Sequence, residues 1–222
     1  MNKRAIVTMV FNPDWEAVFE YSGAAMQRYA NRVGADLIVK RARTSPNRHV
    51  HWEKLDAISG ALEFYERVLW ADVDVLMRDN APSIFDQVPM GCVAGWNEGA
   101  HCNRNDEVEL GCKFYGIEPP PPGSEPYFNA GVVLYDRSAK AMVKMPEREL
   151  VSNMPEQTYQ NIMRYLLKIP FYEVPLFNGL HAFHMDAERR RRLYFVHYAG
   201  HPKLEGWNVS IVEKMILDSQ VG

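Results

Sequence analysis

The sequence predicts an α/β fold with a mixed, mainly parallel central sheet flanked by helices. In the first third of the chain, apolar runs of strand length alternate with stretches whose apolar residues recur at helical spacing. This alternation is typical of parallel strands joined by right-handed crossovers. A length of 222 residues with 47% hydrophobic side chains fits one globular unit, and no change of composition marks a boundary. We therefore predict a single domain over residues 1–222.

The first third contains three predicted strands and two predicted helices. A nearly continuous apolar run over residues 5–11 is typical of a strand that is buried on both faces. The Asn-Pro-Asp sequence at 12–14 then ends this strand and begins a helix, which Gly34 closes. The next predicted elements are a strand at 36–40, a helix at 51–65 and a strand at 67–71. Asn12 and Asp72 both follow predicted strands, at the sheet edge where α/β proteins bind ligands.

The rest of the chain is less regular. A proline run at 119–122 predicts a stiff extended connector, because each proline fixes its own backbone dihedral and disfavours helix before it. Further strands are expected at 91–96, 127–135, 172–176 and 194–198. Further helices are expected at 106–115, 155–167 and 208–217.

Charge and hydropathy exclude several classes of protein. The net charge is −3, whereas a nucleic-acid binder would normally carry a strongly basic face. We therefore expect the arginines at 189–192 to form a solvated surface stretch. No apolar stretch approaches the roughly 18 residues of a membrane helix, and the N-terminal residues leave no room for a signal peptide. These observations predict a cytoplasmic protein with no nucleic-acid partner and no transmembrane segment.

The three cysteines, Cys92, Cys102 and Cys112, do not make a disulfide framework because their number is odd. Together with His101 they could hold zinc, but their ten-residue spacings lack the short Cys-x-x-Cys pair of structural zinc sites. We expect reduced thiols in a reducing compartment.

Asp72 and Asp74 are the first candidates for chemistry. They flank a single residue at the end of a buried strand, and side chains two positions apart in an extended chain point the same way. Both carboxylates can therefore face one divalent cation, and an oxygen site with open positions suits Mg²⁺ or Mn²⁺ bound to a diphosphate. The alternative is a pair of solvated aspartates in a loop.

A second group of candidates begins in the last predicted strand. His197 would complete the metal shell, Gly200 would let the backbone approach a phosphate, and the Lys203 ammonium would neutralise phosphate charge. Taken singly, the histidine and the lysine also have a structural interpretation, as a partly buried side chain and a surface side chain.

Seven short segments occur in an order that is more specific than any one of them. They are Val-Thr-Met-Val-Phe-Asn at 7–12, Lys-Leu at 54–55, Arg-Val-Leu-Trp-Ala-Asp-Val-Asp at 67–74, Phe-Asn-Ala-Gly-Val-Val-Leu-Tyr at 128–135, Glu-Gln at 156–157, Val-Pro-Leu-Phe-Asn at 174–178 and His-Tyr-Ala-Gly-His-Pro-Lys at 197–203. In this order they resemble the nucleotide-sugar glycosyltransferases of the glycogenin and bacterial lipopolysaccharide galactosyltransferase type, a glycosyltransferase family 8-like group. The resemblance implies a GT-A fold with a nucleotide-binding half at 1–80 and a donor-sugar and acceptor half at 81–222.

The resemblance also implies which residues bind the donor. Those expected to contact the nucleotide and its phosphates are Thr8, Val10, Phe11, Asn12, Trp15, Lys54, Asp72, Val73, Gly200 and Lys203. Asp72, Asp74 and His197 would bind Mn²⁺ or Mg²⁺.

Three further residues would act at the reacting sugar. Gln157 and Asn129 would hold sugar hydroxyls or the β-face of the anomeric centre, and Glu156 stands beside them in the catalytic group. Glu156 replaces the aspartate that is usual in the family, and Lys203 is not followed by the usual Pro-Trp. The identity of the donor sugar therefore does not follow from the resemblance.

The resulting expectation is a Mn²⁺- or Mg²⁺-dependent glycosyltransferase that moves a sugar from a UDP-sugar to a glycan or other hydroxyl acceptor. The family implies retention of the anomeric configuration, with the metal and Lys203 stabilising charge on the departing β-phosphate. The irregular segment 98–126 is expected to face the acceptor. Because the chain is short for the family, we expect either a trimmed acceptor side or a place in a larger multidomain protein.

Two other functions remain open. A sugar-1-phosphate nucleotidyltransferase would usually show a glycine-rich first loop with a basic residue, which Asn-Pro-Asp at 12–14 does not offer. A sugar-nucleotide-binding or inactive scaffold domain is disfavoured because all the proposed metal ligands are present.

Overall fold

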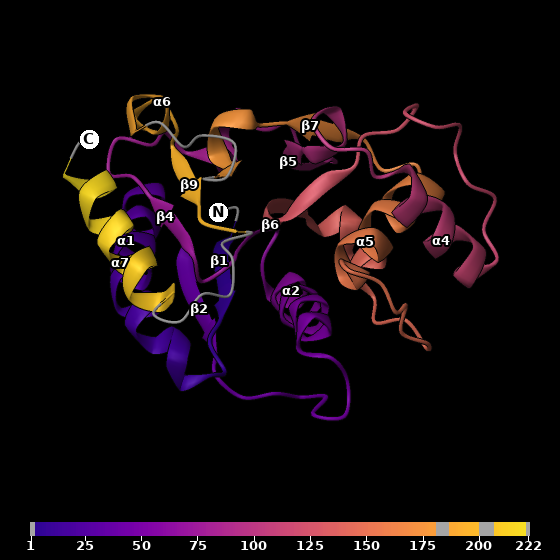
Figure 1. Cartoon of the computed structure of the whole chain (residues 1–222), viewed down its shortest axis with the longest axis horizontal. Coiled ribbons are helices and arrows are strands. Elements are labelled where there is room, and N and C mark those ends of the chain that lie inside the picture. Colours follow the sequence, from indigo (N-terminus) through magenta and orange to yellow (C-terminus); the bar gives the residue numbers. More distant parts are fainter. Residues whose placement is uncertain (1–2, 181–186, 200–206, 221–222) are drawn as a thin grey trace.

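The computed structural model describes residues 3–180, 187–199 and 207–220 (Figure 1). The strands are β1 (Arg4–Met9), β2 (Asp36–Lys40), β3 (Arg67–Ala71), β4 (Val75–Met77), β5 (Val93–Asn97), β6 (Phe128–Asp136), β7 (Phe171–Glu173), β8 (Gly179–Leu180) and β9 (Phe195–His197). The α-helices are α1 (Glu16–Val33), α2 (Glu53–Phe64), α3 (Ile84–Gln87), α4 (Asn105–Tyr115), α5 (Pro155–Leu166), α6 (Ala187–Arg191) and α7 (Trp207–Ser219). Short 3₁₀ helices are η1 (Pro13–Trp15), η2 (Val50–Trp52), η3 (Glu98–Ala100), η4 (Arg137–Val143) and η5 (Pro175–Phe177).

The central sheet has six strands in the order β2-β1-β3-β6-β5-β7. The β1 strand runs parallel to both β2 and β3, and β5 runs parallel to β7. Only β6 is antiparallel to its neighbours β3 and β5. The predicted mixed, mainly parallel sheet is therefore confirmed. Because β6 runs against β3, the end of β3 lies beside the beginning of β6, and Asp72 N donates to Gly131 O at 2.8 Å.

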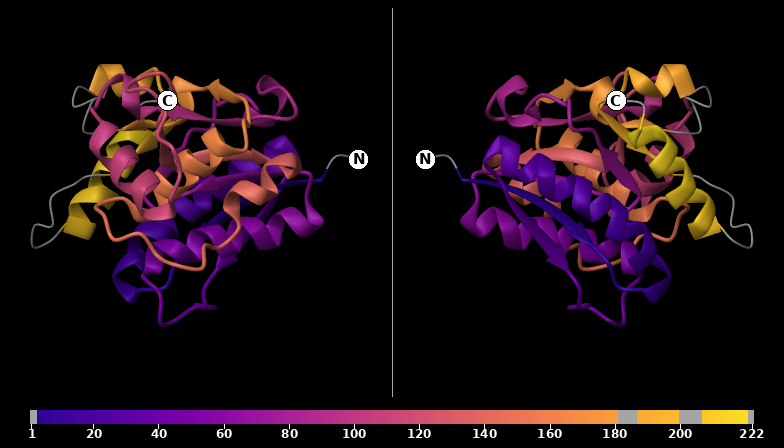
Figure 2. Two further views of the ribbon diagram at one scale, coloured as in Figure 1. Left: turned by 90° about the vertical axis from the view of Figure 1, so that its right-hand side faces the viewer. Right: turned by 90° about the vertical axis from the view of Figure 1, so that its left-hand side faces the viewer.

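Alternate residues of the buried strands face helices on opposite sides of the sheet (Figure 2). Ile6 of β1 packs in one cluster with Met26 and Tyr29 of α1. Its neighbour Val7 packs in the other cluster with Leu55 of α2. Burial on both faces explains why β1 reads as an almost continuous apolar run. The α7 helix packs against the outer side of α1 (Figure 1).

The predicted bounds of the first helix are confirmed by its caps. Asn12 accepts a hydrogen bond from Asp14 N through its side chain at 3.0 Å, and Pro13 begins the η1 turn that leads into α1. At the other end, Gly34 adopts a left-handed conformation with φ of 66°. Glycine reaches this conformation without the steric cost that a side chain would add.

The strand predicted at 194–198 is confirmed as β9, but it belongs to a second sheet, in the order β4-β9-β8, that the sequence does not predict. The β4 and β8 strands have three and two residues and are too short to show a period. In this sheet β9 runs antiparallel to β4, with His197 opposite Val75. A Cβ added at Gly179 in β8 would lie 2.2 Å from Cδ1 of Leu193, so any other residue would force the Leu193 side chain to shift. The sheet carries His197 to the segment that directly follows Asp72 and Asp74.

The arginine run at 189–192 departs from the prediction of a solvated stretch. Arg190 is 8% exposed, and its Nε donates to the Asp218 carboxylate of α7 at 2.8 Å, while its three neighbours in the run are exposed. One arginine of the run therefore anchors α6 to α7.

Within the described residues, the helices include none with the length and apolarity needed to cross a membrane.

Candidate metal and donor site

Asp72 and Asp74 lie in the short turn between β3 and β4. Val75 N donates to Asp72 O at 3.1 Å, which closes the turn. The Asp74 side chain is 11% exposed and the Asp72 side chain 28%. The predicted position at the end of a buried strand is confirmed, and neither aspartate is a freely solvated loop residue.

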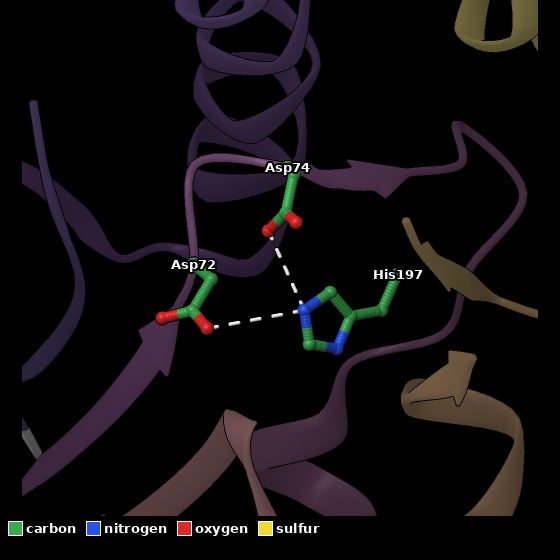
Figure 3. A group of neighbouring side chains, drawn as sticks. All are labelled: Asp72, Asp74 and His197. Atoms are coloured by element: carbon green, nitrogen blue, oxygen red, sulfur yellow. Dashed lines mark ion pairs between the residues drawn. The ribbon is translucent and has the colours of Figure 1, made fainter. Parts of the chain in front are cut away.

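His197 approaches both aspartates from the second sheet (Figure 3). Its Nε2 lies 3.4 Å from Asp74 Oδ1 and 3.8 Å from Asp72 Oδ2. One ligand atom from each of the three residues lies within 4.8 Å of the others. Gly131 makes room for the ring, because a Cβ at this position would lie 1.9 Å from His197 Cε1. The predicted convergence of these three side chains is confirmed.

The cluster of Asp72, Asp74 and His197 is electrostatically paired. Burial is the largest influence on Asp74 and on His197, and it opposes the charge of each. Their mutual attraction outweighs burial, so the pKa of Asp74 lies below its ordinary value and the pKa of His197 above it. Two carboxylates and an imidazole that converge on one point form a donor set that suits Mn²⁺ or Mg²⁺.

Lys54 of α2 is a buried cation beside this cluster. Its Nζ lies 3.1 Å from Asp72 Oδ1 and 3.2 Å from Glu156 Oε1, and it donates to Ala130 O at 3.0 Å. Burial alone would lower the pKa of Lys54, but Asp72 and Glu156 together raise it above the ordinary value. Trp70 Nε1 donates to the same Asp72 oxygen at 2.7 Å. The lysine therefore holds Asp72 in place and supplies positive charge at the site.

Glu156 lies at the start of α5 and is engaged by protein groups. Despite burial, Lys54 and His51 lower the pKa of Glu156 to about 2, so the carboxylate is charged. Its Oε2 lies 3.5 Å from His51 Nδ1. The residue thus forms a buried ion pair behind the cluster of aspartates, and its expected action at the sugar stays a prediction.

Asn129 and Gln157 meet at Glu98, which follows β5. Glu98 Oε2 accepts from Asn129 Nδ2 and from Gln157 Nε2, both at 3.0 Å. Gln157 Oε1 also accepts from Ala130 N at 2.8 Å. The structure therefore brings these two predicted residues together, next to the strand that carries Gly131.

Sequence reasoning missed Glu98 and Asn178 as site residues. Asn178 ends the segment quoted at 174–178, and its Oδ1 lies 2.9 Å from His197 Nδ1. Glu98 follows a predicted strand, as Asp72 does. Its place after a strand end was the one sequence signal that could have identified Glu98 as a site residue.

The residues expected to bind the nucleotide lie at the carboxyl end of β1, beside that of β3. Their exposure differs. Thr8 and Val10 are buried, Phe11, Trp15 and Val73 are half-buried, and Asn12 is exposed. Asn12 caps η1, and Trp15 packs against the α1–α7 cluster. Gly200 and Lys203 lie outside the described residues.

The structure is similar to several solved glycosyltransferases. A glycosyltransferase involved in glycosylation of the major capsid of PBCV-1 has a TM-score of 0.68 and 18% identity, covering 97% of this chain and 99% of that chain. The galactosyltransferase LgtC, in complex with donor and acceptor sugar analogs, has a TM-score of 0.52 and 16% identity, covering 97% and 95%. Mouse xyloside xylosyltransferase 1 has a TM-score of 0.54 and 10% identity, covering 91% and 99%.

No protein-family model matches the sequence, and no curated protein matches it. The likeness to solved structures is one of fold, and it confirms the GT-A fold that the sequence motifs predict.

Proposed function

We propose that the protein is a metal-dependent glycosyltransferase that transfers a sugar from a UDP-sugar to a hydroxyl group of a glycan or other acceptor. One observation carries the proposal: His197, which is far from Asp72 and Asp74 in the sequence, converges with them within 4.8 Å in a chain with a glycosyltransferase fold. A fold by itself hosts many functions, so the convergence of these side chains is the decisive feature.

Asp72, Asp74 and His197 would hold Mn²⁺ or Mg²⁺, which when bound supplies positive charge that stabilises the departing diphosphate. Lys54 keeps Asp72 in a fixed orientation and adds a second positive charge close to it. Such preorganised charge lowers the barrier because it is already in position when negative charge develops on the β-phosphate. Lys203 is proposed to act on the same phosphate.

Asn129 and Gln157 are proposed to orient the donor sugar. Both side chains are at least nine-tenths buried, and both are held by Glu98, so their amides have little freedom to reorient. Fixed donors and acceptors around the anomeric carbon favour one direction of attack. We propose net retention of configuration, which NMR of the product anomer would test.

The test is a panel of UDP- and GDP-sugars incubated with the protein in Mn²⁺ or in EDTA, with release of the nucleoside diphosphate as the readout. We expect hydrolysis or transfer with one UDP-sugar and none in EDTA. The Asp74→Asn variant should lose this turnover by more than about 100-fold, because a metal ligand is removed.

Asp79→Asn is the matched control. Asp79 lies a few residues further along the chain, but its side chain is 71% exposed and paired with Arg28 on the surface. It should retain full turnover. UDP binding by calorimetry without turnover on any donor and acceptor would favour a binding module, and formation of a nucleotide sugar from a sugar phosphate would favour a nucleotidyltransferase.

A further inference from the structure

We propose that Glu98 and Asn178 are positioning residues that, through Asn129, fix the proton of the His197 ring on Nδ1. The Nε2 atom is then the one that faces Asp72 and can bind a cation. The assignment of the proton rests on hydrogen bonds alone, whereas its consequence for metal binding rests on the proposed function.

The direction of the hydrogen-bond chain is set at Glu98. This carboxylate is 3% exposed and forms a salt bridge with Arg104 through Oε1. An ionised carboxylate only accepts hydrogen bonds. The side-chain atom of Asn129 that lies 3.0 Å from Glu98 Oε2 must therefore be the amide nitrogen, Nδ2. The other end of the Asn129 amide is then its oxygen.

A backbone group fixes the Asn129 orientation independently. Gly131 N lies 2.9 Å from Asn129 Oδ1, and a backbone N–H only donates. The same oxygen lies 3.1 Å from Asn178, so Asn178 must present its Nδ2 on this side. The Glu98 carboxylate, which only accepts, and the Gly131 N–H, which only donates, thus lead to the same orientation of the Asn129 amide.

The last link of the chain reaches the imidazole. With its nitrogen used by Asn129, Asn178 turns Oδ1 toward His197 Nδ1 at 2.9 Å. An amide oxygen can only accept, so Nδ1 carries the proton. Asp74 Oδ1 is a competing acceptor 3.4 Å from Nε2, but a neutral ring protonated there would leave Nδ1 and the Asn178 oxygen 2.9 Å apart with no hydrogen between them. His197 Nε2 is consequently the nitrogen with an available lone pair when the ring is neutral. Asn178 is fully buried, so no water competes for these bonds.

Glu98 has a second role in the same arrangement. The oxygen that begins the chain to His197 also accepts from Gln157 Nε2 at 3.0 Å. One carboxylate therefore orients both the imidazole and an amide proposed to contact the sugar. Such outer partners of a ligand typically change metal affinity by 10–100-fold when removed.

The test starts with the protein free of metal. Long-range ¹H–¹⁵N NMR of histidine-labelled protein at about pH 10, where imidazole rings are neutral, reports which nitrogen carries the proton. The signals lost in His197→Gln identify the ring. We expect the Nδ1–H form. A ring protonated at Nε2 would overturn the proposal, whatever the metal-binding result.

The variant Asn178→Leu keeps the number and branching of the side-chain heavy atoms but removes both hydrogen bonds, and Glu98→Gln adds a donor where only an acceptor stood. We expect both to increase the Nε2–H fraction and to weaken Mn²⁺ binding by about 10–100-fold in calorimetry. Unchanged NMR signals and unchanged affinity in Glu98→Gln, which preserves size and burial, would contradict the proposal even if Asn178→Leu fails to fold.

Asn161→Leu is the matched control. Asn161 is another buried asparagine, and it bonds to the backbone N–H and C=O of Phe128 at 2.8 and 3.0 Å. We expect it to lower the melting temperature without changing the His197 tautomer. An equal loss of Mn²⁺ affinity in this variant would assign the effect to general destabilisation. Wild-type protein with the Nδ1–H form but no Mn²⁺ binding would refute the proposed function and leave the proton assignment supported.

Discussion

Replacing Gly131 by alanine should disrupt the cluster of Asp72, Asp74 and His197 without altering any of its ligands. Gly131 lies in β6, directly under the imidazole ring. A Cβ built there would lie 1.9 Å from His197 Cε1, 2.6 Å from Nδ1 and 2.7 Å from Nε2. Real Cβ contacts do not occur at these distances, so the ring must move.

The size of the required movement can be worked from these distances. To reach an ordinary contact of 3.4 Å, Cε1 must retreat from the new methyl group by about 1.5 Å. Metal–ligand distances tolerate deviations of only about 0.2 Å. The displaced His197 would therefore lose its place in the metal shell. We expect Mn²⁺ affinity to fall on the order of 100-fold or more.

The assay is calorimetric titration of Mn²⁺ into Gly131→Ala, together with thermal melting in EDTA to confirm that the variant is folded. Gly60→Ala is the control, because a Cβ at this exposed position of α2 meets nothing within 4 Å. It should leave affinity unchanged and stabilise the helix by up to about 1 kcal/mol. A folded Gly131→Ala protein that binds Mn²⁺ as the wild type does would refute the reasoning.

Three further predictions concern stability. Burial opposes ionisation of Glu53, but hydrogen bonds, led by that from Lys40, lower its pKa to about 2. The ionised carboxylate therefore stabilises the folded protein above its ordinary pKa of 4.5, and this stabilisation is lost as the pH falls to 2. In urea titrations, the free energy of unfolding of Glu53→Gln should be about 3 kcal/mol lower than that of the wild type at pH 7, and the two values should converge near pH 2. A difference that stays constant with pH would contradict this prediction. Lys54→Met leaves the Asp72 and Glu156 carboxylates without their cation and should lower the free energy of unfolding by about 3–5 kcal/mol. An unchanged melting temperature would exclude an important role for the ion pairs of Lys54. Gly179→Ala places a methyl group against Leu193 and should cost about 1–3 kcal/mol in the same titrations, whereas a neutral result would show that the packing relaxes freely.

The central sheet and the cluster of three ligands could be predicted because their signals are local or lie at strand ends. The strands at 36–40 and 67–71 have the predicted bounds. The 67–71 strand is buried at every position and therefore shows an apolar run between clear breaks, whereas the 36–40 strand, which is half-buried at the edge of the sheet, is marked by the short Leu-Ile-Val run after Gly34. Asp72 and Asp74 follow such a run directly. His197 is a candidate from its place in the last predicted strand, but a structural interpretation is equally open, and the family motif at 197–203 adds the reason to place it beside Asp72 and Asp74.

The supporting hydrogen bonds could not be predicted in the same way. Glu98 and Asn178 meet Asn129 only because β6 runs antiparallel between β3 and β5, an order that no single segment of sequence records. The second sheet likewise does not follow from periodicity, because β4 and β8 have only three and two residues and nothing in the predicted strand at 194–198 indicates its partners. Tertiary placement decides these contacts, and each side chain has an ordinary structural role when considered by itself.

The separation of the proposed metal ligands between the β3–β4 turn and the β9 strand has a consequence for the newly made protein. The ribosome completes β3 early, but His197 emerges only after all the strands of the central sheet, of which β7 at Phe171–Glu173 is the last. All the strands of the central sheet are therefore present in the nascent chain before the third proposed ligand has been synthesised. We expect a nascent or prematurely terminated chain to lack high-affinity cation binding until β9 docks on β4. Acquisition of the proposed cation would then follow completion of the central sheet.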